Sequence, residues 1–217
     1  PTTLGEILRD ACSCCNVSLA ADTANFDNST LVVKSRPDDS ALTFRQIIQW
    51  IAQISCKYAK INNRGQLTLK WYDTDLLEKT TADLQNNKNV VKLDKLKNGS
   101  SIETDNVVIT GVRVIEESYI KSSEDESTNA NSETIYQYGT DGYVLEISGN
   151  KLIQNGNGNQ ISEYIGKKLN GIQFRPLSVV SQSDPSVESG DIAVVTDLKG
   201  NTYKTILTGV QYNAGGT

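Results

Sequence analysis

The sequence predicts an α+β protein with two structural units joined by a linker. A helical pattern opened by a capping motif occurs twice, forty positions apart, and each copy is followed by strand-like segments. Alternating apolar segments separated by glycine turns fill most of the second half of the chain. We therefore expect a small αββαββ module at residues 1–72, a linker at 73–100, and a mainly antiparallel β domain with one helix at 101–217.

The first module is predicted from two matching helix starts. Thr3 is followed three residues later by Glu6, and Thr43 is followed in the same way by Gln46. This spacing is typical of a capping box, in which the two side chains satisfy free N–H groups at the helix start. A strand pair after the second helix flanks the turn at 62–65, where a glycine can take a positive φ angle.

The clearest element of the second unit is a β-hairpin within residues 186–213. Apolar residues alternate at 192–196 and at 203–209, around a turn that contains Gly200. Further strands are predicted at 107–115, 135–139, 143–147 and 174–181, and a helix is predicted at 160–170. Gly111 indicates a bulge or a close approach of another backbone.

Two polar segments resemble ligand sites but lack the residues that define such sites. Residues 116–133 are acidic, yet they have no glycine at the spacing of a calcium loop, so we expect a mobile, solvated loop. Residues 155–159 are rich in glycine before the predicted helix, but they lack the lysine of a phosphate-binding loop. We expect this segment only to lead into the helix.

Composition argues against several classes of protein. The net charge is −5 and the pI is about 4.9, so we expect no specific binding of nucleic acid. No apolar run is long enough for a spanning helix, so we expect no membrane insertion. The chain has no histidine, which removes the usual general base and the usual metal ligand. We expect no enzymatic activity and no catalytic, cofactor-binding or metal-binding residues.

The four cysteines are predicted to be reduced and free of metal. They are Cys12, Cys14, Cys15 and Cys56. Three of them lie on one helix and point in different directions, whereas a zinc site needs four converging ligands. We therefore expect small apolar core residues in a reducing compartment.

Both units resemble known families. Residues 3–72 are similar in pattern to the short amino-terminal domain of secretins and TonB-dependent receptors, which implies a docking module. Segments 139–150 and 175–191, together with the hairpin, look like the tail-associated minor structural proteins, or baseplate hubs, of prophages of Gram-positive bacteria. That family has a barrel-like, tail-tube fold, and its signature of glycines, turns and alternating strands includes no catalytic residue.

The hub resemblance implies a structural component of the virion tail. Such a protein joins the tail tube to distal tail parts and lines the DNA channel, with the tail tube, distal tail and tape measure proteins as partners. A homotrimer is implied in the virion. The family usually has two barrels and this chain has one, so we expect the other before Pro1 and a monomer when this chain is isolated.

Two other functions remain open at this point. A carbohydrate- or protein-binding surface module would use exposed aromatic residues, of which Trp50, Trp71 and Tyr143 are the first candidates. A glycoside hydrolase would need two carboxylates at a fixed separation. With 26 acidic residues in the chain, some pair meets that requirement by chance, so the sequence does not favour this function.

Overall fold

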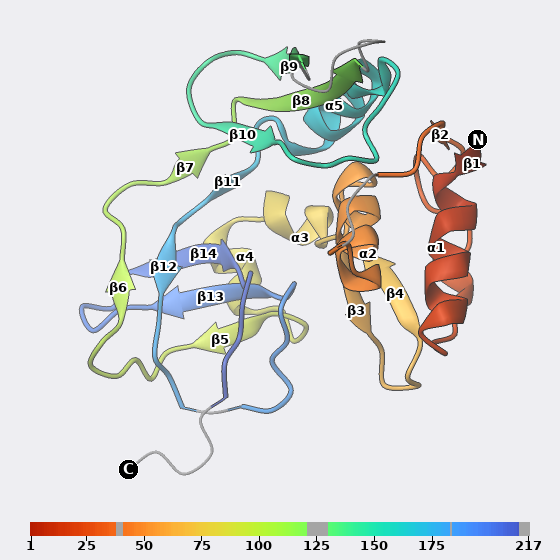
Figure 1. Ribbon diagram of the computed structural model, residues 1–217. Coiled ribbons are helices and arrows are strands. Elements are labelled where there is room, and N and C mark those ends of the chain that lie inside the picture. The colour runs from red at the N-terminus through yellow and green to blue at the C-terminus, as the bar shows by residue number, and fades with distance from the viewer. Residues whose placement is uncertain (38–40, 121–129, 183, 213–217) are drawn as a thin grey trace. The chain divides into compact units, whose positions relative to one another are not determined.

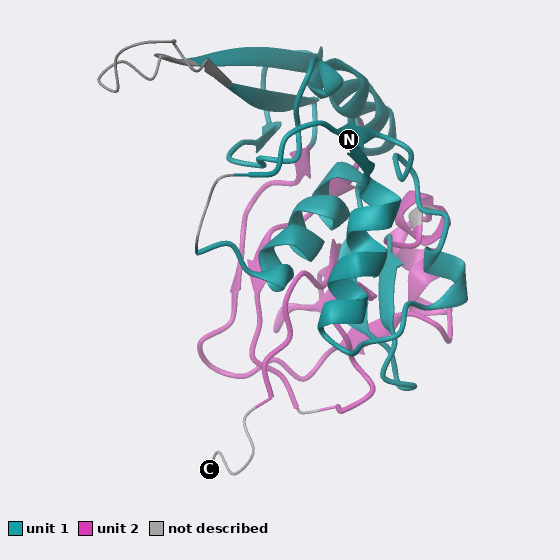
Figure 2. Cartoon of the chain, turned by 45° about the vertical axis from the view of Figure 1, so that its right-hand side comes forward, with its two compact units in different colours: residues 1–71, 109–170 teal, residues 72–108, 171–217 magenta. Residues whose placement is uncertain are grey.

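The computed structural model describes residues 1–37, 41–120, 130–182 and 184–212 (Figure 1). The chain divides into two compact units, each assembled from two separate stretches (Figure 2). Unit 1 comprises residues 1–71 and 109–170, and unit 2 comprises residues 72–108 and 171–217. The sequence instead suggests two contiguous units, at residues 1–72 and 101–217, with a linker between them.

Unit 1 combines three α-helices with seven strands among the described residues. Its helical elements are α1 (Leu4–Cys14), the 3-10 turn η1 (Ala21–Thr23), α2 (Phe44–Ile54) and α5 (Asn157–Leu169). Its strands are β1 (Thr2–Thr3), β2 (Val32–Val33), β3 (Tyr58–Ile61), β4 (Leu67–Lys70), β8 (Gly111–Ile120), β9 (Ala130–Gly139) and β10 (Val144–Ile147).

Unit 2 is built mainly from short strands. Its helices are α3 (Thr74–Glu78) and α4 (Thr81–Gln85). Its strands are β5 (Val91–Leu93), β6 (Ser101–Ile102), β7 (Val107–Val108), β11 (Gln173–Phe174), β12 (Leu177–Ser178), β13 (Ile192–Thr196) and β14 (Thr202–Ile206).

The predicted α+β class is confirmed, but the described strands do not form a barrel. They form six separate sheets, of which the largest have the orders β10-β8-β9 and β14-β13-β5. Each of these two sheets contains one parallel pair, β10 with β8 and β13 with β5. Among the described helices, none has both the length and the apolar character needed to span a bilayer.

Both helices start where the sequence predicts, but the full capping box is present only at α1. The Thr3 hydroxyl accepts a hydrogen bond from the Glu6 N–H, and the Glu6 carboxylate accepts one from the Thr3 N–H. At α2, only the bond from the Gln46 N–H to the Thr43 hydroxyl is present. The αββαββ order expected here is not formed: β3 and β4 follow α2 and pair with each other, whereas β2 pairs with β1, which precedes α1. Among the described residues no ladder links these two pairs.

Residues 73–93 are folded, although the sequence suggests a linker from 73 to 100. Asp73 and Thr80 cap α3 and α4, as their side chains accept hydrogen bonds from the N–H groups of Leu76 and Asp83. The few apolar residues of the segment enter the core of unit 2. That core consists of Leu77, Leu84, Val90, Ile192 and Val194, with Tyr72, Leu76, Ile172 and Ile206 packed around it. The segment folds because β13 supplies the apolar surface that it lacks by itself.

Three further predictions need correction. The strand expected at 107–115 is broken between β7 and β8, because β7 pairs with β11 in unit 2 and β8 belongs to unit 1. The strand expected at 174–181 is two short strands, β11 and β12. The loop expected at 116–133 is strand at 116–120 and at 130–133, and the remainder of this segment lies outside the described residues.

The hairpin predicted around Gly200 is confirmed. Strands β13 and β14 pair over five residues, from Ile192 with Ile206 to Thr196 with Thr202. Gly200 has a φ angle of +83°, which side-chained residues avoid. The Asp197 carboxylate closes the turn, since it accepts hydrogen bonds from the backbone N–H groups of Lys199 and Asn201.

Candidate interaction surface

The longest strands of the described chain, β8 and β9, form an antiparallel ribbon. Ten residue pairs join these strands, from Gly111 with Gly139 to Ile120 with Ala130. On its other side β8 pairs with β10, but only along residues 111–114. Strand β9 is therefore the edge of this sheet, and the outer part of the ribbon has two strands (Figure 1).

Helix α5 covers one face of the ribbon at unusually short distance. A Cβ atom built on Gly166 would lie 2.2 Å from the Tyr138 ring, and one built on Gly158 would lie 2.5 Å from the Tyr136 ring. Both tyrosines belong to β9, and Ser162 is buried between the two glycines. These small residues at every fourth position let the helix backbone approach the aromatic rings.

A buried carboxylate from the ribbon caps α5. Glu116 is 5% exposed, and its two oxygens accept hydrogen bonds from the Gly156 N–H at 2.7 Å and the Gly158 N–H at 3.0 Å. Gly156 has no side chain for this role, so β8 supplies the cap from forty residues away. The negative charge lies at the positive end of the helix dipole.

This carboxylate explains the glycine-rich segment at 155–159. A glycine-rich loop before a helix presents free N–H groups that attract an anion, and phosphate-binding loops use the same arrangement. Here the Glu116 carboxylate takes the position that a bound anion would occupy. The prediction that this segment leads into a helix is confirmed, and the helix begins at Asn157, three residues earlier than expected.

The opposite face of the sheet carries a polar cluster centred on Arg113. The guanidinium donates hydrogen bonds to the side-chain oxygen of Gln137 at 3.1 and 2.9 Å, from Nε and Nη2. It also lies 3.8 Å from the Glu146 carboxylate and 4.0 Å from that of Asp141. This cluster links side chains from all three strands and the β9–β10 turn on a face that α5 does not cover.

The outer part of the ribbon is acidic and partly apolar. Glu117 and Glu133 are direct cross-strand partners, an arrangement that like charges disfavour. Ile135, two residues along β9 from Glu133, is 59% exposed. We define Glu117, Glu133 and Ile135 as the ribbon end.

Unit 1 is held together by a buried amide and by an ionic cluster. The Asn150 side chain donates hydrogen bonds to the Trp50 carbonyl at 3.0 Å and to Gln53 at 2.9 Å, which joins the β10–α5 connection to α2. The Asp27 carboxylate lies 3.3 Å from Lys168 of α5 and 3.7 Å from Lys57. Residues 1–71 and 109–170 therefore support one another within unit 1.

The Asp27 cluster makes unit 1 sensitive to acid. A hydrogen bond from the Tyr164 hydroxyl, and then the charges of Lys168 and Lys57, lower the pKa of Asp27 below its ordinary value of 3.8. Burial and the Asp27 carboxylate raise the pKa of Tyr164, so that hydroxyl stays protonated and donates. A depressed carboxyl pKa contributes stability above the unfolded value, and that stability is lost as the pH falls through the folded value.

Asp27→Asn is expected to lower the free energy of unfolding at pH 7, because the amide cannot pair with two lysines. The difference from the original chain should shrink as the pH falls from 3.8 through the lower pKa that Asp27 has in the folded chain. Urea unfolding at pH 7, 5, 4 and 3 measures this difference. Asp10→Asn, an exposed position on α1, is the control and should change nothing at pH 7. A difference that is constant over the whole pH range would contradict the assignment.

The cysteines occupy two environments. Cys12 and Cys56 are buried, whereas Cys14 and Cys15 are exposed, which corrects the expectation that all four are core residues. Cys15 is the C-cap of α1. Burial raises the pKa of the Cys12 thiol, and it raises that of Cys56 to about 11. The described cysteines are free thiols, and among the described residues no group of three or more acidic, cysteine or histidine side chains is placed to hold a metal ion.

Thiol titration of the native protein is expected to show two fast and two slow groups. Exposed Cys14 and Cys15 should react first, because the thiolate is the reactive species and burial disfavours it at Cys12 and Cys56. In denaturant without reductant all four should react. A Cys14→Ser and Cys15→Ser variant that keeps a fast phase would contradict this assignment.

The aromatic candidates do not form an exposed platform. Trp50 is buried in α2, with 9% exposure, and Trp71 is half-buried at the end of β4. Tyr143 is 47% exposed, directly before β10. No residue of the ribbon is predicted from the sequence to be functional. The spacing of Gly158, Ser162 and Gly166 is the signal that could have pointed to the contact of α5 with β9.

Comparison with known proteins gives one structural similarity. No family model matches the sequence, and no curated protein matches it. Among solved structures, the chain is similar to the 43 kDa tail protein of prophage MuSo2 from Shewanella oneidensis, with a TM-score of 0.41 and 9% sequence identity. The alignment covers 94% of this chain and 57% of that one, so the chain spans little more than half the length of the tail protein.

Proposed function

We propose that this chain is a structural component of a phage tail, located at the tail tip or baseplate hub. In this role it joins the tail tube to distal tail parts as a trimer whose sheets line the DNA channel. The resemblance of segments 139–150 and 175–191 to hub proteins supports the assignment. We further propose that the open sheets of this chain and of its neighbours close into one barrel.

The observation that carries the proposal is the open edge of β9. A ten-residue edge strand exposes a row of backbone donors and acceptors that pairs readily with another chain. In a closed symmetric assembly every such edge finds a partner and growth stops. In a protein that assembles, this edge can pair with another copy. In a monomeric enzyme or binding module, the same edge would have to be protected against aggregation.

The test combines assembly in solution with location in the virion. The complete protein should form a defined oligomer by light scattering, and labelled protein should appear at the tail tip by electron microscopy. Ile135→Lys places a charge at the ribbon end and should abolish the oligomer without unfolding the chain, because this side chain is already exposed. Leu198→Lys, at a position 90% exposed in the β13–β14 turn, is the matched control. A complete protein that is monomeric and absent from the tail tip would overturn the proposal.

We also propose that this chain has no enzymatic activity, because its role in the assembly is structural. A turnover assay with peptidoglycan and soluble polysaccharides should give no product above background. Reproducible turnover that disappears when one carboxylate is changed would contradict this, and would favour a glycoside hydrolase instead.

A further inference from the structure

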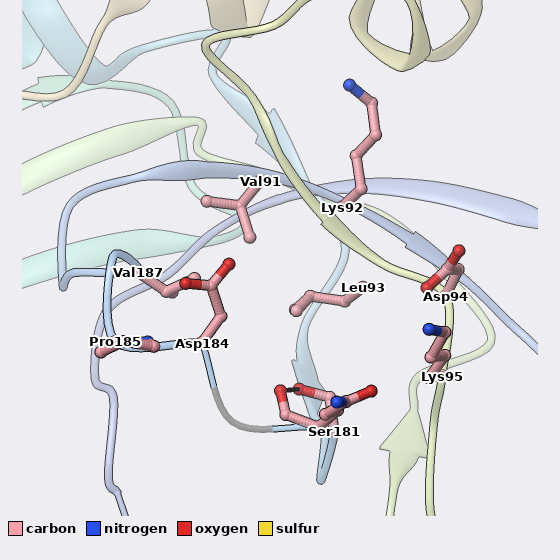
Figure 3. A pocket seen from close by; sticks show the side chains of 10 residues that line it. Val91, Lys92, Leu93, Asp94, Lys95, Ser181, Asp184, Pro185 and Val187 are labelled. Carbon is pink, nitrogen blue, oxygen red and sulfur yellow. Dashed lines mark hydrogen bonds between the residues drawn. The ribbon is translucent and has the colours of Figure 1, made fainter.

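A groove of about 320 Å³ borders strand β5 in unit 2. Figure 3 shows the side chains that line it, among them Asp94, Asp184 and Lys95. Carboxylates and an ammonium group line the same space, so charge selects neither an anion nor a cation there. The cysteines at the end of helix α1 form a more selective site.

Two of these three cysteines are neighbours on the helix surface. Cys12 and Cys15 are three positions apart, and helix geometry places Cα atoms at this spacing about 5 Å apart. Side chains at this spacing lie on adjacent sides of a helix. Cys15 keeps helical geometry although it is the C-cap, with φ at −85° and ψ at −2°, and its N–H donates to the Ala11 carbonyl at 3.1 Å.

Cys14 is less well placed to bond either of the other two. Its Cα atom lies about 3.8 Å from that of Cys15, below the range of roughly 4.4–6.8 Å that disulfides usually span. Cys12 and Cys14 are two positions apart, so their side chains point to opposite sides of the helix. Of the three pairs, only Cys12 with Cys15 has both a suitable separation and a shared side.

The turn that follows the cysteines holds this spacing in the native chain. The Val17 N–H donates to the Cys12 carbonyl at 2.9 Å, and the Asn16 N–H donates to the Ser13 carbonyl at 3.1 Å. Asn16 has a φ angle of +54°. These features define a Schellman motif, which ends a helix with a fixed last turn.

The two thiols differ in access but interact electrostatically. Cys12 is 3% exposed, whereas Cys15 is exposed to solvent. Burial, and then the charge of the Cys15 thiolate, raise the pKa of Cys12. Cys56 belongs to the Asp27 cluster, whose charges act on its pKa after burial. A reagent in solution therefore meets Cys15 first, and Cys12 is the thiol beside it.

We propose that Cys12 and Cys15 form a reversible disulfide when the chain meets a small disulfide oxidant such as oxidised glutathione. The Cys15 thiolate attacks one sulfur of the oxidant, a mixed disulfide forms, and one glutathione thiolate leaves. The Cys12 thiolate then attacks the Cys15 sulfur, and the second glutathione thiolate leaves. The two protons of the protein thiols pass to the two glutathione thiolates, so two protein thiols are oxidised and one oxidant disulfide is reduced. This inference goes beyond the proposed function and does not depend on it.

The geometry also sets how the disulfide behaves. Cβ atoms three positions apart on a helix are separated by about 5–6 Å, and a disulfide brings them to about 3.8 Å. The last turn of α1 must tighten against its Schellman bonds, and this strain makes the disulfide easy to reduce. The second step should be slower than the first, because Cys12 is buried.

Treatment of the full, reduced chain with micromolar oxidised glutathione tests the proposal. Intact mass spectrometry counts the glutathione adducts, and fragmentation of alkylated peptides locates the bond. In Cys14→Ser, which lacks the competing exposed thiol, the cyclised chain should exceed the Cys15 adduct roughly tenfold, since Cys12 acts at an effective concentration in the millimolar range. A millimolar buffer of reduced glutathione should reopen the bond, whereas a structural disulfide resists it.

Two further variants identify the partners. Cys15→Ser should not cyclise and should keep a glutathione adduct at Cys14, and Cys12→Ala should keep adducts at both exposed positions. Cys15→Ser changes an exposed side chain, so it decides the outcome if Cys12→Ala unfolds, and circular dichroism checks the fold of each variant. A bond from Cys14 to either neighbour would overturn the inference. A Cys15 adduct that persists in folded Cys14→Ser would overturn it as well.

Discussion

Gly166→Ala is expected to destabilise unit 1 by roughly 3 kcal/mol, although alanine favours helices. A Cβ atom at this position would lie 2.2 Å from Cδ1, 2.3 Å from Cγ and 2.6 Å from Cβ of Tyr138. Because the contact reaches the base of the tyrosine side chain, a change of ring rotamer does not relieve it. Helix α5 must move away from β9, which loosens the packing of the whole sheet face. Urea unfolding of the variant measures the loss.

Two comparisons separate this clash from a general effect of removing glycine. Gly209→Ala adds the same methyl group where nothing lies within 4 Å, so stability should hardly change. Tyr138→Gly removes the Cβ as well as the ring, and it should also destabilise by itself, because it leaves a cavity under α5. Adding Gly166→Ala to that variant should then cost little. If the two changes are additive, the short contact is not the cause.

Glu116→Ala is expected to lower the stability of unit 1 by roughly 3 kcal/mol. The substitution leaves the N–H groups of Gly156 and Gly158 without their acceptor at a buried helix start. It also removes the negative charge that interacts with the helix dipole. Glu116→Gln should cost about half as much, because the amide retains one oxygen acceptor of similar shape.

The control for this prediction is another glutamate of the same ribbon. Glu133→Gln alters an exposed carboxylate and should leave the unfolding midpoint nearly unchanged. Hydrogen exchange at the first turn of α5 should accelerate in Glu116→Ala and stay slow in Glu133→Gln. An unchanged exchange rate in Glu116→Ala would show that the helix start does not depend on this carboxylate.

Local sequence determined the elements whose stabilising contacts lie a few residues apart. The start of α1 was predictable because Thr3 and Glu6 are only three residues apart. Each side chain accepts a hydrogen bond from the backbone N–H of the other residue. The turn at Gly200 was predictable for the same reason, since Asp197 accepts from N–H groups two and four residues later. The sequence also pointed correctly to a close backbone approach at Gly111, where a Cβ would lie 2.7 Å from the Tyr138 carbonyl oxygen.

Only the tertiary structure decided which distant segments pair. Strand β10 follows β9 after a short turn, and sequence alone favours a hairpin, yet β10 pairs in parallel with β8. Residues 73–93 appear too polar to fold, but they bury Leu77, Leu84 and Val90 against β13, more than a hundred residues away. Helix α5 begins where Glu116 reaches it from another element. The pairing of β10, the folding of residues 73–93 and the start of α5 all depend on burial against partners that are remote in sequence. A local sequence pattern contains no information about such partners.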